Sequence, residues 1–262
     1  MSPKSCESSV WISRFSKMLS PMAFTLLVLL VWHCAVSLLS IPEYILPTPF
    51  AVAMTLVSEF ALFFRESAVS FVEAIAGLLL GASLGFLSAV AFVHSRFLER
   101  AIYPYAIVLK TIPLVALAPL LTLWFGVGLL GKVIMASLLC YFPVLVNTTL
   151  GLRSVDELSL EYFRSVAASK VQCFFKLRLP TSLPYLFSAL RISATMSMLG
   201  AIVAELTGAN RGIGYQILAA SYRLETTKLV AALVWTGAIG LVLFGVVVAI
   251  EKWLVNWEHY AD

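Results

Sequence analysis

Six stretches of this chain are long and apolar enough to cross a membrane as α-helices. A spanning helix needs roughly 20 mainly apolar residues, because each residue advances about 1.5 Å across a hydrocarbon core about 30 Å thick. The stretches cover residues 22–40, 67–93, 103–124, 132–150, 184–206 and 229–250. They lack the two-residue alternation of barrel strands. The sequence therefore predicts an all-α, polytopic membrane protein with six transmembrane helices.

Composition excludes a water-soluble fold for the chain as a whole. Hydrophobic residues make up 61% of the sequence and charged residues 12%, and the mean hydropathy is +0.96. A chain of this composition cannot cover itself with a polar surface, so the bilayer must serve as its solvent. We expect a multi-pass protein of the cell inner (plasma) membrane, in contact with membrane lipid.

The basic residues predict the orientation of the chain. The first apolar stretch is expected to stay as an anchor, because its core is too long for a signal peptide and no small-residue cleavage site follows it. With the N-terminus inside, eleven Lys and Arg residues lie on the cytoplasmic side and five on the outer side, the outer ones being Arg65, Lys132, Arg211, Arg223 and Lys228. This excess places both termini and the connection at 151–183 in the cytoplasm. Topology therefore explains the net charge of +4 without a nucleic-acid partner.

Nothing in the sequence indicates catalysis or a resident cofactor. Residues 126–132, GVGLLGK, match a glycine-rich nucleotide fingerprint, but Val133 stands where a magnesium-binding hydroxyl is needed. Apolar helices flank the motif on both sides, so a tight outer turn is the better interpretation. The cysteines and histidines are scattered, at positions 6, 34, 140 and 173 and at 33, 94 and 259. We expect no metal, no cofactor and no enzyme activity.

Small residues and prolines suggest how the helices pack. Three glycines recur every fourth residue in the second stretch: Gly77, Gly81 and Gly85. This spacing lets two helix backbones approach closely in lipid. The third stretch carries three prolines: Pro104, Pro113 and Pro119. The first can occupy an opening turn, whereas the other two each remove a backbone donor and favour a kink.

Four charged residues fall within or near the predicted helices: Glu73, Lys110, Arg191 and Glu205. A charge at a helix centre costs about 2.5–3.5 kcal/mol on insertion scales, so each is expected to face protein, water or an opposite charge. Lys110 and Arg191 can instead extend to the cytoplasmic interface. Glu205 precedes the glycine-rich run 208–214, where accepting hydrogen bonds or pairing with a base such as Arg211 would let it organise an outer gate. We expect these four residues in a translocation path or gate.

A polar, basic segment, EYFRSVAASKVQCFFKLRLP, lies between apolar stretches at residues 161–180. Its spacing resembles the coupling loop of binding-protein-dependent ABC importer permeases, whose pattern is Glu-Ala-Ala, three residues, Gly, nine residues, Ile, any residue, Leu-Pro. Glu161 stands at the Glu, Ala167 at the Gly, Leu177 at the Ile, and Leu179 with Pro180 at the end. Tyr162-Phe163 and Ala167 depart from the pattern.

The resemblance extends over roughly residues 40–255. Residues 46–49 (LPTP), Ile112-Pro113, residues 124–126 (WFG), Ala204-Glu205 and residues 212–215 (GIGY) resemble permeases of the aliphatic sulfonate, nitrate and taurine importer group. Glu73 departs from it, because these permeases commonly have a basic residue near this position. The departure leaves the transported substrate open.

The resemblance implies a single permease domain over residues 1–262 and a homodimer that works with two cytoplasmic ATPases and an extracytoplasmic solute-binding protein. The segment 161–180 would contain a short helix seated in a cleft of the ATPase, and Pro180 would help fix where the fifth span begins. The expected coupling residues are Glu161, Ala167, Lys170, Phe174, Phe175, Leu177, Leu179 and Pro180, with Val171, Lys176 and Arg178 as further contacts.

Two other classes of function are the alternatives. An ATP-independent channel or secondary transporter would be self-sufficient and often has an internal repeat, and inspection finds none. An intramembrane enzyme would need a nucleophile and base or a metal cluster within the helices, and none stands out. A solvated connector without a partner is the alternative for residues 161–180.

Overall fold

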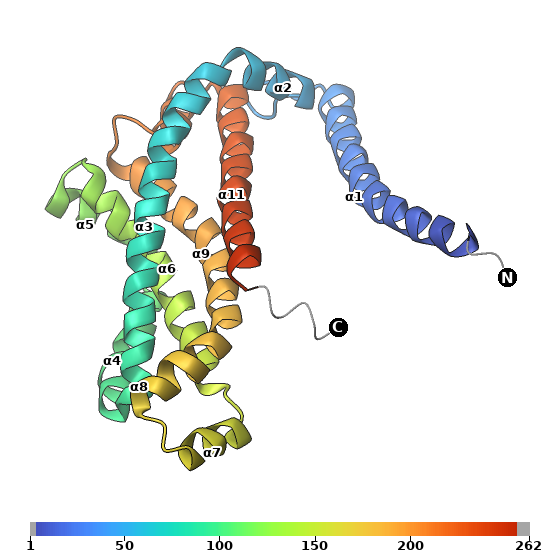
Figure 1. Ribbon diagram of the computed structural model, residues 1–262. Coiled ribbons are helices and arrows are strands. Elements are labelled where there is room, and N and C mark those ends of the chain that lie inside the picture. The colour runs from blue at the N-terminus through green and yellow to red at the C-terminus, as the bar shows by residue number, and fades with distance from the viewer. Residues whose placement is uncertain (1–3, 256–262) are drawn as a thin grey trace. The chain divides into compact units, whose positions relative to one another are not determined.

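The computed structural model describes residues 4–255, and every regular element in this range is a helix (Figure 1). For residues 4–20 and 114 only the backbone is described. In chain order the helices are α1 (Lys4–Leu38), α2 (Pro49–Ser58), α3 (Phe60–His94), α4 (Arg96–Thr111), α5 (Leu114–Phe125), α6 (Leu129–Arg153), α7 (Glu157–Ser165), α8 (Lys170–Cys173), the π-helical turn η1 (Phe174–Arg178), α9 (Leu179–Gly208), α10 (Ile213–Tyr222) and α11 (Thr226–Leu254).

The all-α prediction is confirmed, and five of the six predicted spans are continuous helices. The candidate spans are Pro21–Leu38, Phe60–His94, Leu129–Arg153, Lys170–Gly208 and Thr226–Leu254. The predicted span 103–124 is instead two helices, α4 and α5, bent by 104° at the break between them. The described residues therefore hold five spans, or six if the bent pair counts as one.

Pro113 explains the break. Ile112 adopts an extended conformation (φ −68°, ψ 127°), as a residue before proline prefers. Pro113 itself lacks the N–H that would continue the α4 ladder and becomes the N-cap residue of α5. Pro119 lies inside α5 without ending it. The expectation for Pro104 was wrong: α4 begins earlier than the apolar stretch, with its first turn capped by the Ser95 side chain, so Pro104 lies well inside the helix.

The chain divides into two compact units, each described by itself. The first comprises residues up to Phe60 together with Ala220–Ala231. Within it, the Thr226 hydroxyl donates to the Tyr44 carbonyl oxygen at 2.6 Å and the Thr227 hydroxyl to Glu43 Oε1 at 2.7 Å. Lys228 Nζ lies 3.3 Å from Glu59 Oε1. These contacts tie the first turn of α11 to the region around α2.

In the second unit, Ala61–Ala219 with the chain from Ala232 onward, α3, α6 and α9 lie side by side (Figure 1). The glycine stripe of α3 packs on α6 as predicted. A Cβ atom at Gly85 would lie 2.8 Å from the Tyr141 carbonyl oxygen and 3.0 Å from Val144 Cβ. Gly77 and Gly81 are similarly close to Ala136 and Ser137. Close backbone approach therefore holds the centre of this unit together.

The first prediction concerns this approach. Gly85→Ala should lower the free energy of unfolding by about 1–3 kcal/mol, because the added methyl group overpacks against α6 backbone. Gly240→Ala on α11 is the matched control, since a Cβ there meets nothing within 4 Å. Thermal unfolding in detergent measures both. Equal melting temperatures for the two variants would contradict the packing.

Candidate functional site: the connector and a buried carboxylate cluster

The connector between α6 and α9, residues 154–178, is built from capped helices. Asp156 Oδ2 accepts a hydrogen bond from the Ser159 backbone N–H at 2.8 Å and so starts α7. The same bond lowers the pKa of Asp156. Ser169 and Gln172 form a reciprocal capping box at the start of α8. The segment expected to contain a short helix therefore holds α7, a turn and the beginning of a second helix.

Ala167 sits in this turn with φ +52°, in the left-handed region. A side chain costs about 1–2 kcal/mol in this region, whereas glycine adopts it freely. The position at which the coupling-loop pattern has glycine is thus the position at which this backbone favours glycine. The turn keeps its shape with alanine at some cost in strain.

The outer face of α7 is apolar and uncovered in this chain. Leu158, Tyr162 and Val166 are 78%, 64% and 56% exposed. They recur at helical spacing beside the exposed Glu161. Phe175 adds a further aromatic ring that is 61% exposed. Large apolar side chains gathered on one polar segment are typical of a surface that binds another protein.

Phe174 and Phe175, predicted as a pair with one role, face different surroundings. Phe174 packs against the core cluster of Ala89, Phe92 and Leu145, and its ring lies 5.6 Å from that of His94. Phe175 is 61% exposed, and its ring lies 5.1 Å from that of Phe174. Phe174 is the more buried of the two, and the ATPase contacts expected of both stay a prediction. Leu177, Leu179 and Pro180 are half-buried.

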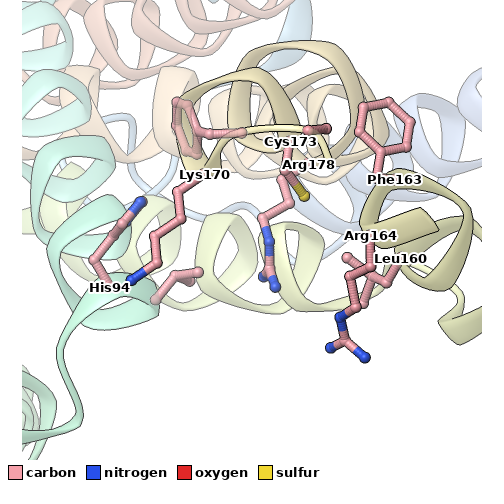
Figure 2. Close-up of a pocket in the computed structure, with 10 residues that line it drawn as sticks. His94, Leu160, Phe163, Arg164, Lys170, Cys173 and Arg178 are labelled. Carbon is pink, nitrogen blue, oxygen red and sulfur yellow. The ribbon is translucent and has the colours of Figure 1, made fainter. Parts of the chain in front are cut away.

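A cavity of about 470 Å³ separates α7 from the end of α3 and from α8 (Figure 2). Lys170, Arg164 and Arg178 extend to the same side of it (Figure 2). Arg178 Nη1 donates to the Leu152 carbonyl oxygen at 3.0 Å and so ties the connector to the end of α6. The inner side of the connector is therefore basic, and its outer side is apolar.

Pro180 lies in the first turn of α9, as expected, although helical structure already precedes it. The helix runs without interruption from Lys170 through η1 and α9 to Gly208, a length of 39 residues. The Leu179 N–H bonds the Phe174 carbonyl, five residues back, and this wide turn precedes Pro180, which has no N–H to donate. One helix thus joins the connector to the far end of α9.

At that far end lies a buried carboxylate cluster, made of Glu66, Ser70 and Glu73 on α3, Lys132 on α6 and Glu205 on α9. The three α3 residues recur at i, i+4 and i+7 and so share one helix face. Glu205 is fully buried. The Ser70 hydroxyl donates to its Oε1 at 2.6 Å, and the Gly214 N–H donates to its Oε2 at 2.6 Å.

The cluster also holds the loop between α9 and α10. The Gly212 N–H donates to Glu66 Oε2 at 2.9 Å, and the Ile213 N–H donates to Ser70 Oγ at 2.9 Å. Gly212 has φ +107°, and a Cβ atom there would overlap the Glu205 carboxyl group. Three consecutive backbone N–H groups therefore bond to the cluster, and glycine is required for the approach.

Basic residues compensate the buried charge. Lys132 Nζ bonds Glu73 Oε1 at 2.8 Å, and both side chains are buried. Arg65 Nε lies 3.0 Å and Arg211 Nε 3.7 Å from the Glu66 carboxylate. Glu73 also lies close enough to Glu205 to interact with it electrostatically. Two expectations are corrected: Arg211 pairs with Glu66 and not with Glu205, and Arg65 and Lys132 belong to helices and not to outer loops.

The other two predicted path residues lie apart from this cluster. Arg191 Nη2 on α9 pairs with Glu251 Oε1 on α11 at 3.3 Å. The Lys110 ammonium on α4 lies 4.6 Å from the centre of the Phe142 ring on α6. Within the residues that the structure describes, no group of His, Cys, Asp and Glu is placed to hold a metal ion.

Sequence reasoning missed Glu66, Ser70 and Lys132. The i, i+4, i+7 spacing of the α3 residues was visible in the sequence and is the signal that could have found two of them. Their partners were not visible, because Glu66 bonds a residue 146 positions away.

Comparison with known proteins identifies the class. Residues 77–256 match the family described as binding-protein-dependent transport system inner membrane component. The chain is 34% identical over 228 residues to a probable ABC transporter permease of Haemophilus influenzae, covering 87% of this chain and 93% of that protein. It is 32% identical to the formylaminopyrimidine transport permease of Halalkalibacterium halodurans, covering 94% and 99%. It is 31% identical to the putative aliphatic sulfonates transport permease of Bacillus subtilis, covering 88% and 85%.

Solved structures agree on the fold. A structure titled as inward-facing MetNI methionine ABC transporter matches with a TM-score of 0.59 at 18% identity, covering 72% of this chain and 93% of that chain. The chain belongs to the binding-protein-dependent permease family. It is a multi-pass membrane protein and the transmembrane permease subunit of an ABC importer, and the self-sufficient channel or secondary transporter finds no support.

The second prediction tests the carboxylate cluster. Ser70→Ala removes a hydroxyl that joins the Ile213 N–H to Glu205, so it should lower the free energy of unfolding by about 1–3 kcal/mol. Ser67→Ala is the matched control on the same helix, because within the described residues the Ser67 hydroxyl donates to the Phe64 carbonyl oxygen of α3 itself. Thermal unfolding compares them, and a Ser70→Ala protein as stable as Ser67→Ala would contradict the cluster's role.

Proposed function

We propose that two copies of this chain form the translocation path of an ABC importer and that each copy seats its connector on one cytoplasmic ATPase. The exposed apolar face of α7, with Leu158, Tyr162 and Val166, supplies the docking surface together with Phe175. Glu161 and Lys170 add exposed charges beside it. A connector with no partner would not keep these side chains in water, so their exposure is what favours docking.

The observation that carries the coupling mechanism is the single helix from Lys170 to Gly208. Its 39 residues correspond to a length of about 58 Å. One end belongs to the docking surface, and the other carries Glu205 in the carboxylate cluster. A tilt imposed on the connector by closure of the ATPases therefore reaches the cluster directly. The π-helical turn η1 is the place where such a helix can flex.

The cluster acts in this mechanism as a latch on the α9–α10 loop. In the resting arrangement Glu66, Ser70 and Glu205 hold the N–H groups of residues 212–214. A shift of α9 relative to α3 would break these bonds together, because the acceptors lie on both helices. Two arrangements of the loop then correspond to two states of the path. ATP drives the change only if it binds the two states with different affinity.

The orientation follows from the basic residues. Arg65 and Lys132, counted with the outer loops, pair with buried carboxylates inside helices. Removing them from the outer set strengthens the excess of basic residues on the side of the connector. Both termini and the connector then lie in the cytoplasm of the cell, and the α9–α10 loop faces outward.

The solute is a small organic molecule that an extracytoplasmic binding protein delivers. The relatives that support this are permeases for formylaminopyrimidine and for aliphatic sulfonates. The chain matches nearly the full length of both, so it is expected to form the same part of the importer. The pairing of two identical copies rests on the resemblance to this group.

The third prediction tests docking. Phe175→Asp should fold normally, because its ring is exposed, and should weaken ATPase binding at least about tenfold by removing an aromatic contact. Phe174→Asp should instead destabilise the protein by on the order of 3 kcal/mol, because its ring packs in the core. Co-purification with the ATPase and thermal unfolding give the two readouts.

Tyr222→Asp is the control for docking, since this aromatic side chain is 82% exposed outside the connector. ATPase binding should be unchanged in this variant. Normal binding in Phe175→Asp would contradict the assigned surface. Transport by the purified chain in liposomes without any ATPase would overturn the proposed function as a whole.

A further inference from the structure

A cavity of about 430 Å³ lies between α4, α6 and α9 in the membrane-spanning part of the chain. Its wall is mostly apolar and includes Leu139, Phe142, Ile192 and Met196. Lys110 is the charged residue among those that line it, and no acidic residue takes part. This combination of size, apolar wall and few polar groups is typical of a small-molecule site.

The Lys110 ammonium has no carboxylate partner in the part of the chain that the structure describes. It lies 4.6 Å from the centre of the Phe142 ring. Lys132 and Arg191, two basic residues in the spanning helices α6 and α9, each pair with a glutamate. Lys110 is exposed and lines the cavity, so its ammonium is accessible to a ligand there. A charge at the centre of a spanning helix costs about 2.5–3.5 kcal/mol unless it faces water or a partner, and an anionic ligand would supply such a partner. The Asn147 amide nitrogen donates one hydrogen bond to the Pro143 carbonyl oxygen, and Lys110 is the charged group of the lining.

The break in the third span lies beside this cavity. Lys110 belongs to the last turn of α4, and the chain leaves the helix at Ile112 before α5 begins. Broken helices in transporters often mark the place where a solute is bound, because backbone carbonyls at a break need polar partners. The broken span and the unpaired ammonium are independent observations that point to the same position.

We propose that this cavity is a solute-binding site of the permease itself and that it accepts a small organic anion with an apolar or planar body. The anionic group would pair with Lys110, and the body would pack on Phe142, Leu139 and Met196. This inference rests on the proposed function, and it adds a site and a charge class for the solute. The charge on Lys110 discriminates between an anion and a neutral molecule of the same shape.

The experiment measures binding to the purified permease in nanodiscs, without ATPase. The probes are p-toluenesulfonate and its neutral counterpart p-toluenesulfonamide, and ligand-observed NMR titration gives their dissociation constants after subtraction of empty nanodiscs. The anion should bind wild-type protein at least about tenfold more tightly than the sulfonamide. Lys110→Met should abolish this preference, and Lys110→Arg should keep most of it.

Lys252→Met is the matched control, because Lys252 is an exposed lysine at the end of α11 and does not line the cavity. It should bind both probes as the wild-type protein does. Size-exclusion chromatography and thermal unfolding confirm that the variants fold. Equal binding of the two probes, or an unchanged preference in Lys110→Met, would show that Lys110 only extends to the interface and would overturn the proposal. ATPase docking is measured separately, so failure of coupling and failure of this site are distinguishable.

Discussion

The structure depends on how three glutamates are kept inside an apolar protein. A buried carboxylate is costly unless it is paired and hydrogen-bonded. Glu205 accepts from Ser70 on α3 and from Gly214 in the first turn of α10, and Glu66 accepts from Gly212 just before that helix and from its neighbour Arg65. Lys132 compensates Glu73 in the same way across α3 and α6. The cluster can therefore form only when α3, α6, α9 and the α9–α10 loop are in place together. It sets the register of these elements, and the glycine stripe of α3 supplies the close approach that the register needs.

The same geometry explains how a chain without a recognisable ATP site can respond to ATP. The exposed apolar face of α7 is available to another protein, and the helix that follows it extends to Glu205. The basic inner side of the connector ties that helix to the end of α6 through Arg178. In the proposed mechanism, force applied at the connector would be carried by the backbone hydrogen bonds of this one helix to the bonds that hold the α9–α10 loop. The inferred solute cavity at Lys110 lies between α6 and this same helix, where its movement would change the cavity.

The features that could be predicted from the sequence are those that depend on residues close together in the chain. The apolar stretches and the glycine spacing on α3 follow from properties of neighbouring residues, and the structure confirms them. Pro113 was expected to kink one span, and the structure has a full break into two helices there. The environment of a side chain could not be predicted where it is determined by a residue far away in the sequence. The α3 helix starts at Phe60 and therefore includes Arg65 and Glu66. The reason Glu66 can be buried there is its hydrogen bond from Gly212, a residue far away in the sequence. The different environments of Phe174 and Phe175 depend on the core around Phe92, which no local pattern reveals. The coupling and path roles of the named residues stay predictions.

Hydrogen exchange at residues 212–214 in the assembled importer tests the central claim most directly. In the resting state these amides should exchange slowly, because each donates to a buried side chain of the cluster. With ATP trapped between the ATPases, the account predicts that their protection falls by at least about tenfold while the amides at the centre of α6 keep theirs. Slow exchange of residues 212–214 in both states, or rapid exchange in both, would contradict a latch that ATP opens through the connector.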